Sequence, residues 1–264
     1  MLSCKGGGQV AENTFRRMEK KIMVKTSEVD ALKSRVEEHM VPDKFNLDGK
    51  PYMICNLYYD DDSNSVIRNS IQLPKYKEKL RLRSYGVPDD DSKVFIELKK
   101  KFKGVGTKRR AKITLKEIED FLQYRTYPQK LSYIDEQVLR EIDYYLSHHT
   151  VYPRTYVSYL RFAYFAADDP SFRVTFDHDI LTRRYDLDLR LGRYGDPLLP
   201  LDTTLVEVKF SGAVPVWFCR VMSDFGISFN TFSKYGTSFK RYTYDLSQKE
   251  GNLLPPFELT GSQK

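Results

Sequence analysis

Basic side chains recur at alternate positions in several stretches that have the pattern of β-strands. In the segment 79–83 (KLRLR), three cations share one face of the strand and two leucines share the other. Lys108 and Arg110 alternate in the same way. Like charges at neighbouring positions repel one another and weaken a sheet, so such a face is best tolerated where a polyanion covers it. The pattern predicts binding of a dense anion, with an ordinary solvated face as the alternative for any single strand.

Carboxylates stand among these cations. Glu19, Glu97 and Glu207 each share a strand face with one or two basic residues. Mg²⁺ and Mn²⁺ take oxygen ligands and usually keep waters and substrate phosphates, so a few glutamates suffice to hold such an ion beside a phosphorylated ligand. The mixture of acids and bases therefore predicts a divalent metal at the same site.

The composition limits the classes of protein to be considered. The chain has 264 residues, with 43 Lys and Arg against 36 Asp and Glu, and a net charge of +7. Aromatic residues make up 14% of the chain, which excludes an intrinsically disordered protein. No apolar run approaches the length of a membrane span and Met1 to Val10 do not form a secretory signal, so a cytoplasmic location is expected. Three scattered cysteines and four histidines form no metal-binding pattern.

Four segments have the periodicity of amphipathic helices. Thr114 and Glu117 have the spacing of a capping box. Ser132, and Thr26 or Ser27, are in position to cap two other helices. The expected helices are 27–40, 114–124, 132–147 and 215–225.

Most of the remaining chain alternates between apolar and polar residues with the period of β-strands. The expected strands are 15–25, 52–59, 66–71, 75–85, 93–103, 106–113, 154–166, 171–177, 180–184 and 203–210. Short connections between successive strands favour antiparallel pairing. The sequence therefore predicts an α+β protein built on a large antiparallel sheet, with one domain at 14–245 between flexible tails at 1–13 and 246–264.

The apolar faces of these strands need to be covered. Their positions include Leu80, Leu82, Val94, Ile96, Leu98, Val206 and Val208. If the predicted helices pack against the apolar face, the charged face is left concave or inside a barrel. Small barrels are normally filled by apolar side chains, whereas one lined with cations would hold water and a ligand. The pattern therefore predicts a tunnel that binds a ligand.

Six short motifs occur in order along the chain. They are Glu19-x-Lys21, Leu80-Arg81-Leu82-Arg83-Ser84-Tyr85-Gly86, Glu97-Leu98-Lys99, Tyr159-x-Arg161-x-Ala163-Tyr164, Glu207-Val208-Lys209 and Phe232-Ser233-Lys234-Tyr235. This ordered set resembles the VTC domain, the catalytic domain of the vacuolar transporter chaperone polyphosphate polymerases, and is most similar to its stand-alone prokaryotic members. The resemblance covers about residues 14–244. It implies the fold of the triphosphate tunnel metalloenzymes, or CYTH-like fold, an antiparallel β-barrel open at both ends with helices packed outside.

The resemblance also implies roles for individual residues. It implies phosphate binding and catalysis by Lys21, Arg81, Arg83, Lys99, Lys108, Arg161 and Lys234. It implies that Glu207 binds the metal, Mn²⁺ or Mg²⁺, with Glu97 and Glu19 as helpers. Strand parity, the alternation of side chains between the two faces of a strand, adds further phosphate-binding cations on the same faces: Arg17, Lys79, Lys101, Arg110, Arg173 and Lys209. Asp177 is expected to add another carboxylate.

These assignments concentrate the charge of the protein. The thirteen basic residues exceed the three glutamates by ten, which is more than the net charge of +7 of the whole chain. The remainder of the protein would then be slightly acidic. Low-dielectric walls focus such a field, so the expected partner is a thin, dense polyanion such as polyphosphate. Duplex nucleic acid, which needs an exposed basic face, is not expected.

The resemblance finally implies a reaction. ATP or another nucleoside triphosphate would bind in the tunnel and transfer its γ-phosphate to phosphate, pyrophosphate or a growing polyphosphate chain. Two alternatives stay open: a triphosphatase or NTP hydrolase of the same fold, and a non-catalytic module that binds polyphosphate. Eukaryotic members of the family carry membrane helices. None is expected in this chain, and export of the product through a membrane partner protein is left open.

Overall fold

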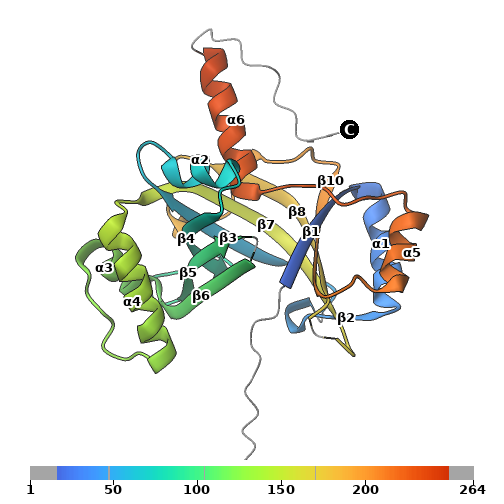
Figure 1. Cartoon of the computed structure of the whole chain (residues 1–264), viewed down its shortest axis with the longest axis horizontal. Helices are drawn as coiled ribbons and strands as arrows, with labels where there is room; N and C mark the ends of the chain where they lie inside the picture. The colour runs from blue at the N-terminus through green and yellow to red at the C-terminus, as the bar shows by residue number, and fades with distance from the viewer. Residues whose placement is uncertain (1–16, 47, 104, 170, 250–264) are drawn as a thin grey trace, which may run out of the picture.

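The structure is a computed structural model that describes residues 17–46, 48–103, 105–169 and 171–249. The tail expected at 1–13 lies outside the described residues, as does the second expected tail from residue 250 onwards. The last described helix continues to Lys249, so it includes the first four residues of the tail expected from 246. Figure 1 shows helices to the left, to the right and at the top of a central sheet.

A ten-stranded antiparallel sheet forms the centre of the described structure and confirms the α+β class. Its strands are β1 (Arg17–Lys25), β2 (Met40–Pro42), β3 (Tyr52–Asp60), β4 (Tyr76–Tyr85), β5 (Lys93–Phe102), β6 (Val105–Thr114), β7 (Tyr152–Ala166), β8 (Arg173–Arg183), β9 (Asp196–Pro197) and β10 (Thr203–Ser211). The order is β1-β10-β8-β7-β3-β4-β5-β6, with β2 beside β7 and β9 beside β8. The expected pairing of successive strands is present from β3 to β6 and between β7 and β8. The segments 171–177 and 180–184, predicted as two strands, form the single strand β8.

Six α-helices lie in the described residues. They are α1 (Thr26–Glu37), α2 (Ser65–Ile71), α3 (Leu115–Tyr124), α4 (Tyr133–His148), α5 (Val216–Asp224) and α6 (Lys234–Lys249), with short 3-10 turns η1 (Lys44–Asn46) and η2 (Leu189–Leu191). The capping box of Thr114 and Glu117 is present at α3, and Ser132 caps α4. The side-chain cap expected from Thr26 or Ser27 is absent at α1, because Thr26 is already inside the helix. None of the described helices combines the length and apolar character that a membrane span requires.

The sequence pattern does not predict α2 or α6. Residues 66–71, predicted as a strand, belong to α2. The buried carboxylate of Asp60 accepts hydrogen bonds from the backbone N–H groups of Val66 and Ile67, both at 2.9 Å. These bonds satisfy donors in the first turn that a helix cannot satisfy by itself. A contact of this kind, between the end of one strand and the start of the next element, leaves no periodic signal in the sequence.

The sheet curls without closing. Within the described strands, β1 and β6 remain its two edges. Side chains of β1 nevertheless lie near those of β4 and β5. Burial and nearby cations, Lys21 of β1 among them, lower the pKa of Lys79 on β4. The pKa of Glu19 on β1 is lowered against the effect of burial, and Lys99 on β5 is among the cations that lower it. The predicted barrel is therefore an open, curled sheet with one concave face.

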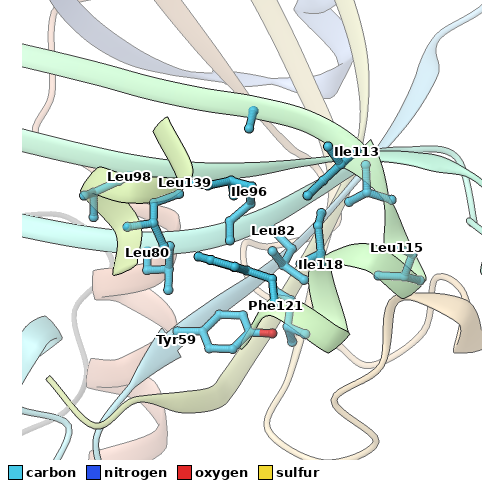
Figure 2. Packing of buried hydrophobic residues seen from close by; sticks show 14 of the residues in the cluster. Tyr59, Leu80, Leu82, Ile96, Leu98, Ile113, Leu115, Ile118, Phe121 and Leu139 are labelled. Carbon is cyan, nitrogen blue, oxygen red and sulfur yellow. The ribbon is translucent and has the colours of Figure 1, made fainter. Parts of the chain in front are cut away.

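Two layers of helices cover the convex face. α3 and α4 pack against β3 to β6, and α1 and α5 pack against β1, β10 and β8. Figure 2 shows the first layer, in which sheet residues meet helix residues: Leu80, Leu82, Ile96 and Leu98 with Leu115, Ile118, Phe121 and Leu139. Burial of each large apolar side chain contributes about 1.5–3 kcal/mol. The apolar positions predicted from the sequence lie on this face, which turns the alternate charged positions inward.

α6 packs on the other face, beside Ile67 of α2. Tyr235 and Phe239 of α6 lie among buried residues of the concave face that include Ile54, Val157 and Tyr159. α6 and α2 stand together at the top of the view in Figure 1, whereas β2 lies at the bottom. The helices are therefore not all outside the sheet, and α6 brings the N-terminal end of a helix onto the concave face.

The loop 186–202, for which the sequence suggests no role, is organised by Arg183. The side chain of Arg183 is buried, and its guanidinium stacks at 3.5 Å over the ring of Tyr156. It donates hydrogen bonds of 3.0–3.1 Å to four backbone carbonyl groups, those of Asp186, Asp188, Gly192 and Tyr194. One buried cation thus fixes the path of the loop.

Replacement of Arg183 by Met should unfold the protein more easily. Four carbonyl groups would lose their donor, and we expect the free energy of unfolding to fall by about 3 kcal/mol. Urea denaturation monitored by circular dichroism measures this change. Arg140→Ala, on an exposed face of α4, is the control and should have no measurable effect. Equal stability of Arg183→Met and the unmodified protein would contradict this role for Arg183.

Candidate anion-binding site

The strand register places the predicted cations in rows across the concave face. Lys79, Lys99 and Lys108 lie directly opposite one another on β4, β5 and β6. In the next row, Arg81 of β4 is opposite Glu97 of β5. Cross-strand neighbours are about 5 Å apart, so a row of three lysines is strongly self-repelling unless an anion lies along it.

Four buried side chains form a second group on the same face, which we name the ion cluster: Arg161 of β7, Asp177 of β8, Glu207 of β10 and Lys234 of α6. Arg161 donates to both carboxylate oxygens of Asp177 at 2.5 and 2.6 Å. Lys234 donates to Asp177 at 2.6 Å and to Glu207 at 2.8 Å. Each side chain is at most about a tenth exposed. The cluster ties α6 to three separate strands.

All members of the ion cluster are held in their charged forms. Burial alone would raise the pKa of Asp177, but Arg161 and Lys234 lower it below its usual range. Burial would likewise raise the pKa of Glu207, and Lys234, Lys209 and Arg161 hold it well below its usual range. Burial opposes the charge of Lys234, yet Asp177 and Glu207 keep its pKa raised. The cluster is two ion pairs, and its cations are already neutralised.

Glu97 holds cations in the same way. Its side chain is 1% exposed, and it accepts hydrogen bonds from Arg81 at 2.6 Å and from Lys108 at 3.1 Å. Burial would raise its pKa, but Arg81, Arg83 and Lys108 keep it far below the usual range. Both carboxylate oxygens are therefore engaged by basic side chains.

Arg83 and Lys79 carry charge without a carboxylate partner among the described contacts. Arg83 donates to the side-chain oxygen of Asn56 at 2.9 Å and to the hydroxyl of Tyr159 at 3.2 Å. Burial, with Lys77, Lys99 and Arg81 nearby, lowers the pKa of Lys79 to about 7. An incoming anion could pair with these two side chains directly, because neither donates a hydrogen bond to a carboxylate among the described contacts.

The predicted metal ligands divide into a pair and a separate residue. The β1–β10 register places Lys21 opposite Glu207 and Lys209 opposite Glu19, so the two glutamates are diagonal neighbours. Burial and Glu207 would raise the pKa of Glu19, but Lys209, Lys21 and Lys99 lower it to about 2. No group of three acidic, histidine or cysteine side chains able to hold a metal occurs among the described residues. Two carboxylates fit Mg²⁺ or Mn²⁺ that also binds phosphate and water, whereas Glu97 stands apart in its own ion pairs.

The other predicted cations lie around these groups. Exposed on the concave side of β5 and β6 are Lys99, Lys101 and Arg110. Lys209 donates to Glu207 at 3.3 Å. Arg173 donates to Asp43 at 2.8 Å, so it has an acid of its own. The side chain of Arg17 lies outside the described part of the chain.

Polar uncharged residues complete the site, and the sequence pattern did not identify them as functional. Asn56, Tyr58 and Tyr159 orient the two arginines of β4; the hydroxyl of Tyr58 accepts from Arg81 at 3.2 Å. The alternation of side chains along β3 and β7 could have identified them, since all three lie at inward positions of these strands. Tyr235 lies in α6, a helix that the sequence pattern does not predict. Its hydroxyl donates to Asp60 at 2.7 Å. This bond fixes the residue next to Lys234.

Removal of the charge of Asp177 should expose the repulsion that this residue neutralises. In Asp177→Asn, two buried cations would share one carboxylate, and the free energy of unfolding should fall by about 3 kcal/mol. Tripolyphosphate should restore more stability to this variant than to the unmodified protein, because the ligand supplies the missing negative charge. Urea denaturation with and without tripolyphosphate measures both effects. Asp179→Asn, at an exposed position of the same strand, is the matched control; an Asp177 variant that behaves like it would contradict the account.

Lys79 should make anion binding depend on pH. Its pKa of about 7 means that it is charged below and mostly neutral above neutral pH. A bound anion favours the ammonium form, so affinity for tripolyphosphate should fall as pH rises through 7. In Lys79→Arg the charge persists, and the variant should bind about 10-fold more tightly than the unmodified protein at about pH 8 but similarly at about pH 6. Titration calorimetry measures the ratio, and a ratio independent of pH would contradict the assignment.

Comparison with known proteins finds one family model and several solved structures of low sequence identity. The profile of the VTC domain matches residues 16–242. A candidate adenylate cyclase from Bacillus halodurans is 15% identical, covers 83% of this chain and 95% of its own, and has a TM-score of 0.48. A candidate adenylyl cyclase from Hippeastrum with a dominant triphosphatase activity is 16% identical, covers 92% of this chain and 100% of its own, and has a TM-score of 0.46.

A comparison with curated proteins gives no match. The family match extends over both groups of charged side chains, from Lys21 on β1 to Lys234 on α6. It also confirms the resemblance drawn from the six ordered motifs. The chain therefore belongs to the VTC domain family.

Proposed function

We propose that the protein is a metal-dependent phosphotransferase that moves the γ-phosphate of ATP, or of another nucleoside triphosphate, to phosphate or to the end of a growing polyphosphate chain. The observation that supports this most strongly is the row of three opposed lysines beside two arginines on the concave face of a VTC domain. A linear phosphate chain has the charge density and the width that such a row requires.

The arginine and lysine side chains of the site would bind phosphate in different ways. Arg83 presents a planar guanidinium group to phosphate oxygens and is held in place by Asn56 of β3 and Tyr159 of β7. Arg81 is held by Glu97 of β5 and adds its charge beside it. The lysines act as point charges that tolerate movement of a chain along them. A phosphate chain bound in this way is extended along the concave face and is contacted from several strands at once.

Transfer to a phosphate acceptor needs little proton chemistry. The attacking oxygen of phosphate or polyphosphate is already anionic near neutral pH, so no general base is required. The barrier is lowered by holding donor and acceptor in line and by neutralising the equatorial oxygens. Asp177 holds Arg161 and Lys234 in place before any ligand arrives, which is the preorganisation that charge stabilisation in a transition state depends on.

Glu207 and Glu19 are the residues that would hold Mn²⁺ or Mg²⁺. The metal, when bound, supplies positive charge to the phosphoryl oxygens as a Lewis acid. Lys21 and Lys209 flank the two carboxylates and neutralise them in its absence. On this proposal, the same lysines release the carboxylates to the metal and turn to phosphate oxygens.

The proposal is tested by incubating the pure protein with ATP labelled at the γ-phosphate, Mn²⁺ and a short polyphosphate primer. Products are then resolved by chain length on a gel. We expect a ladder of labelled polyphosphate that grows with time. Release of labelled phosphate with no ladder under any primer condition would overturn the transferase and identify a hydrolase; binding without turnover would identify a binding module.

Glu207→Gln separates catalysis from binding in the same assay. It keeps the shape of the side chain but loses the charge that would hold the metal, so turnover should fall by at least about 100-fold. Binding of tripolyphosphate without metal should persist, because the lysine row is unchanged. Glu78→Gln, a carboxylate of β4 that pairs with Lys100, is the matched control and should keep full activity. Unchanged turnover in Glu207→Gln would contradict its proposed role.

A further inference from the structure

Four aromatic rings gather at one end of the concave face: Phe45 of η1, Tyr52 of β3, Tyr85 of β4 and Phe95 of β5. We name this group the aromatic platform. Its ring centroids are 5.7 Å apart for Phe45–Tyr52, 6.0 Å for Phe45–Tyr85 and 5.8 Å for Tyr85–Phe95. Phe45 is 57% exposed and Tyr85 is 44% exposed. Two large rings of this connected group therefore present surface to solvent.

The strand topology places the platform next to the ion cluster. Tyr52 begins β3 and is directly opposite Arg161 of β7. Burial raises the pKa of Tyr52 to about 12, and Arg161 and Arg173 are close enough to act against that shift. α6, by contrast, reaches the opposite end of β3, where Tyr235 meets Asp60. The platform thus lies at the end of the concave face that α6 does not cover.

Cations surround the aromatic rings. Arg110 lies 4.7 Å from the ring centroid of Phe95, and Lys112 lies 5.8 Å from it. Lys44 lies 5.2 Å from the ring centroid of Phe45. Phe95 is also directly opposite Arg83, one of the two arginines of the candidate site. A ligand that fits here has a flat aromatic part for the rings and a negatively charged part for the adjoining cations.

We propose that the aromatic platform binds the base of a nucleoside triphosphate by stacking, while the triphosphate extends along β4 past Arg83 to Arg81. This inference rests on the proposed function, because it assigns the donor end of the same site. Bases stack on aromatic side chains irrespective of their identity, which suits a site whose specificity lies in the phosphates. The platform then determines the end of the concave face at which the donor enters.

The spacing along β4 agrees with this arrangement. Side chains on one face of a strand repeat about every 7 Å, so Arg83 is about 7 Å and Arg81 about 14 Å along the strand from Tyr85. That span is comparable with the length of a ribose carrying an extended triphosphate. A base over Tyr85 therefore places its phosphates beside both arginines and leaves the lysine row beyond them for the acceptor chain.

The decisive experiment compares three ligands in titration calorimetry: ATP, ribose 5-triphosphate and tripolyphosphate. In the unmodified protein, ATP should bind about 10-fold more tightly than ribose 5-triphosphate, which lacks the base. In the double variant Phe45→Leu/Tyr85→Leu, ATP affinity should fall about 10-fold and tripolyphosphate affinity should stay within about 2-fold. Tyr124→Leu, a ring that is 66% exposed on α3, is the matched control and should change neither.

The outcomes separate the two proposals. Equal affinity of the unmodified protein for ATP and ribose 5-triphosphate would overturn the platform and leave the phosphate site intact. Absence of tripolyphosphate binding to the unmodified protein would overturn the proposed function and the platform with it. If the double variant fails to fold, the single variant Phe45→Leu, at the more exposed ring, replaces it with the same expectations. An ATP affinity that neither variant changes would also overturn the platform.

Discussion

Repulsion among cations on one concave face is the constraint on which the rest of this structure depends. Unpaired charges in a partly buried site are costly, so the fold must supply counter-charges or leave the cations in contact with water. It does both. On the β7–β10 side, Asp177 and Glu207 pair with Arg161 and Lys234. On the β4–β6 side, Glu97 neutralises part of the charge and the lysines face the open edge.

This division explains why the sheet can be open and still be built around an anion site. The neutral ion cluster is stable without ligand and serves as a fixed wall. The lysine row is the part that gains from binding, because an anion there removes repulsion as well as adding attraction. The charge of the acids is therefore as important as the charge of the bases: Asp177, Glu207 and Glu97 decide which cations are free when the ligand arrives.

Much of this arrangement could be predicted from strand parity alone. Lys79, Arg81 and Arg83 lie inward because Leu80 and Leu82 must be buried, and the period of two leaves no other choice. The role of Glu97 could not be predicted in this way. Parity placed it on the correct face, but only the three-dimensional packing shows that Arg81 and Lys108 occupy both of its oxygens, which separates it from the predicted metal ligands.

Local periodicity in the sequence does not predict α2 or α6, and both helices depend on contacts of the same residue. Both are held by Asp60, which caps α2 and accepts a hydrogen bond from Tyr235 across 175 residues of sequence. Long-range contacts of this kind are invisible to local periodicity. The motif around Lys234 marked the correct residue, whereas the helix that carries it onto the concave face required the fold.

The central claim is that the concave face fits a thin, linear polyanion, and competition binding tests it most directly. A labelled long polyphosphate would be displaced, at fixed salt and without metal, by phosphate, pyrophosphate, tripolyphosphate, longer chains and a short DNA duplex of equal total charge. Affinity should rise steeply with chain length until the face is filled, and the duplex should compete at least about 10-fold more weakly than the matched polyphosphate. Competition by the duplex equal to that of polyphosphate, or affinity independent of chain length, would contradict it.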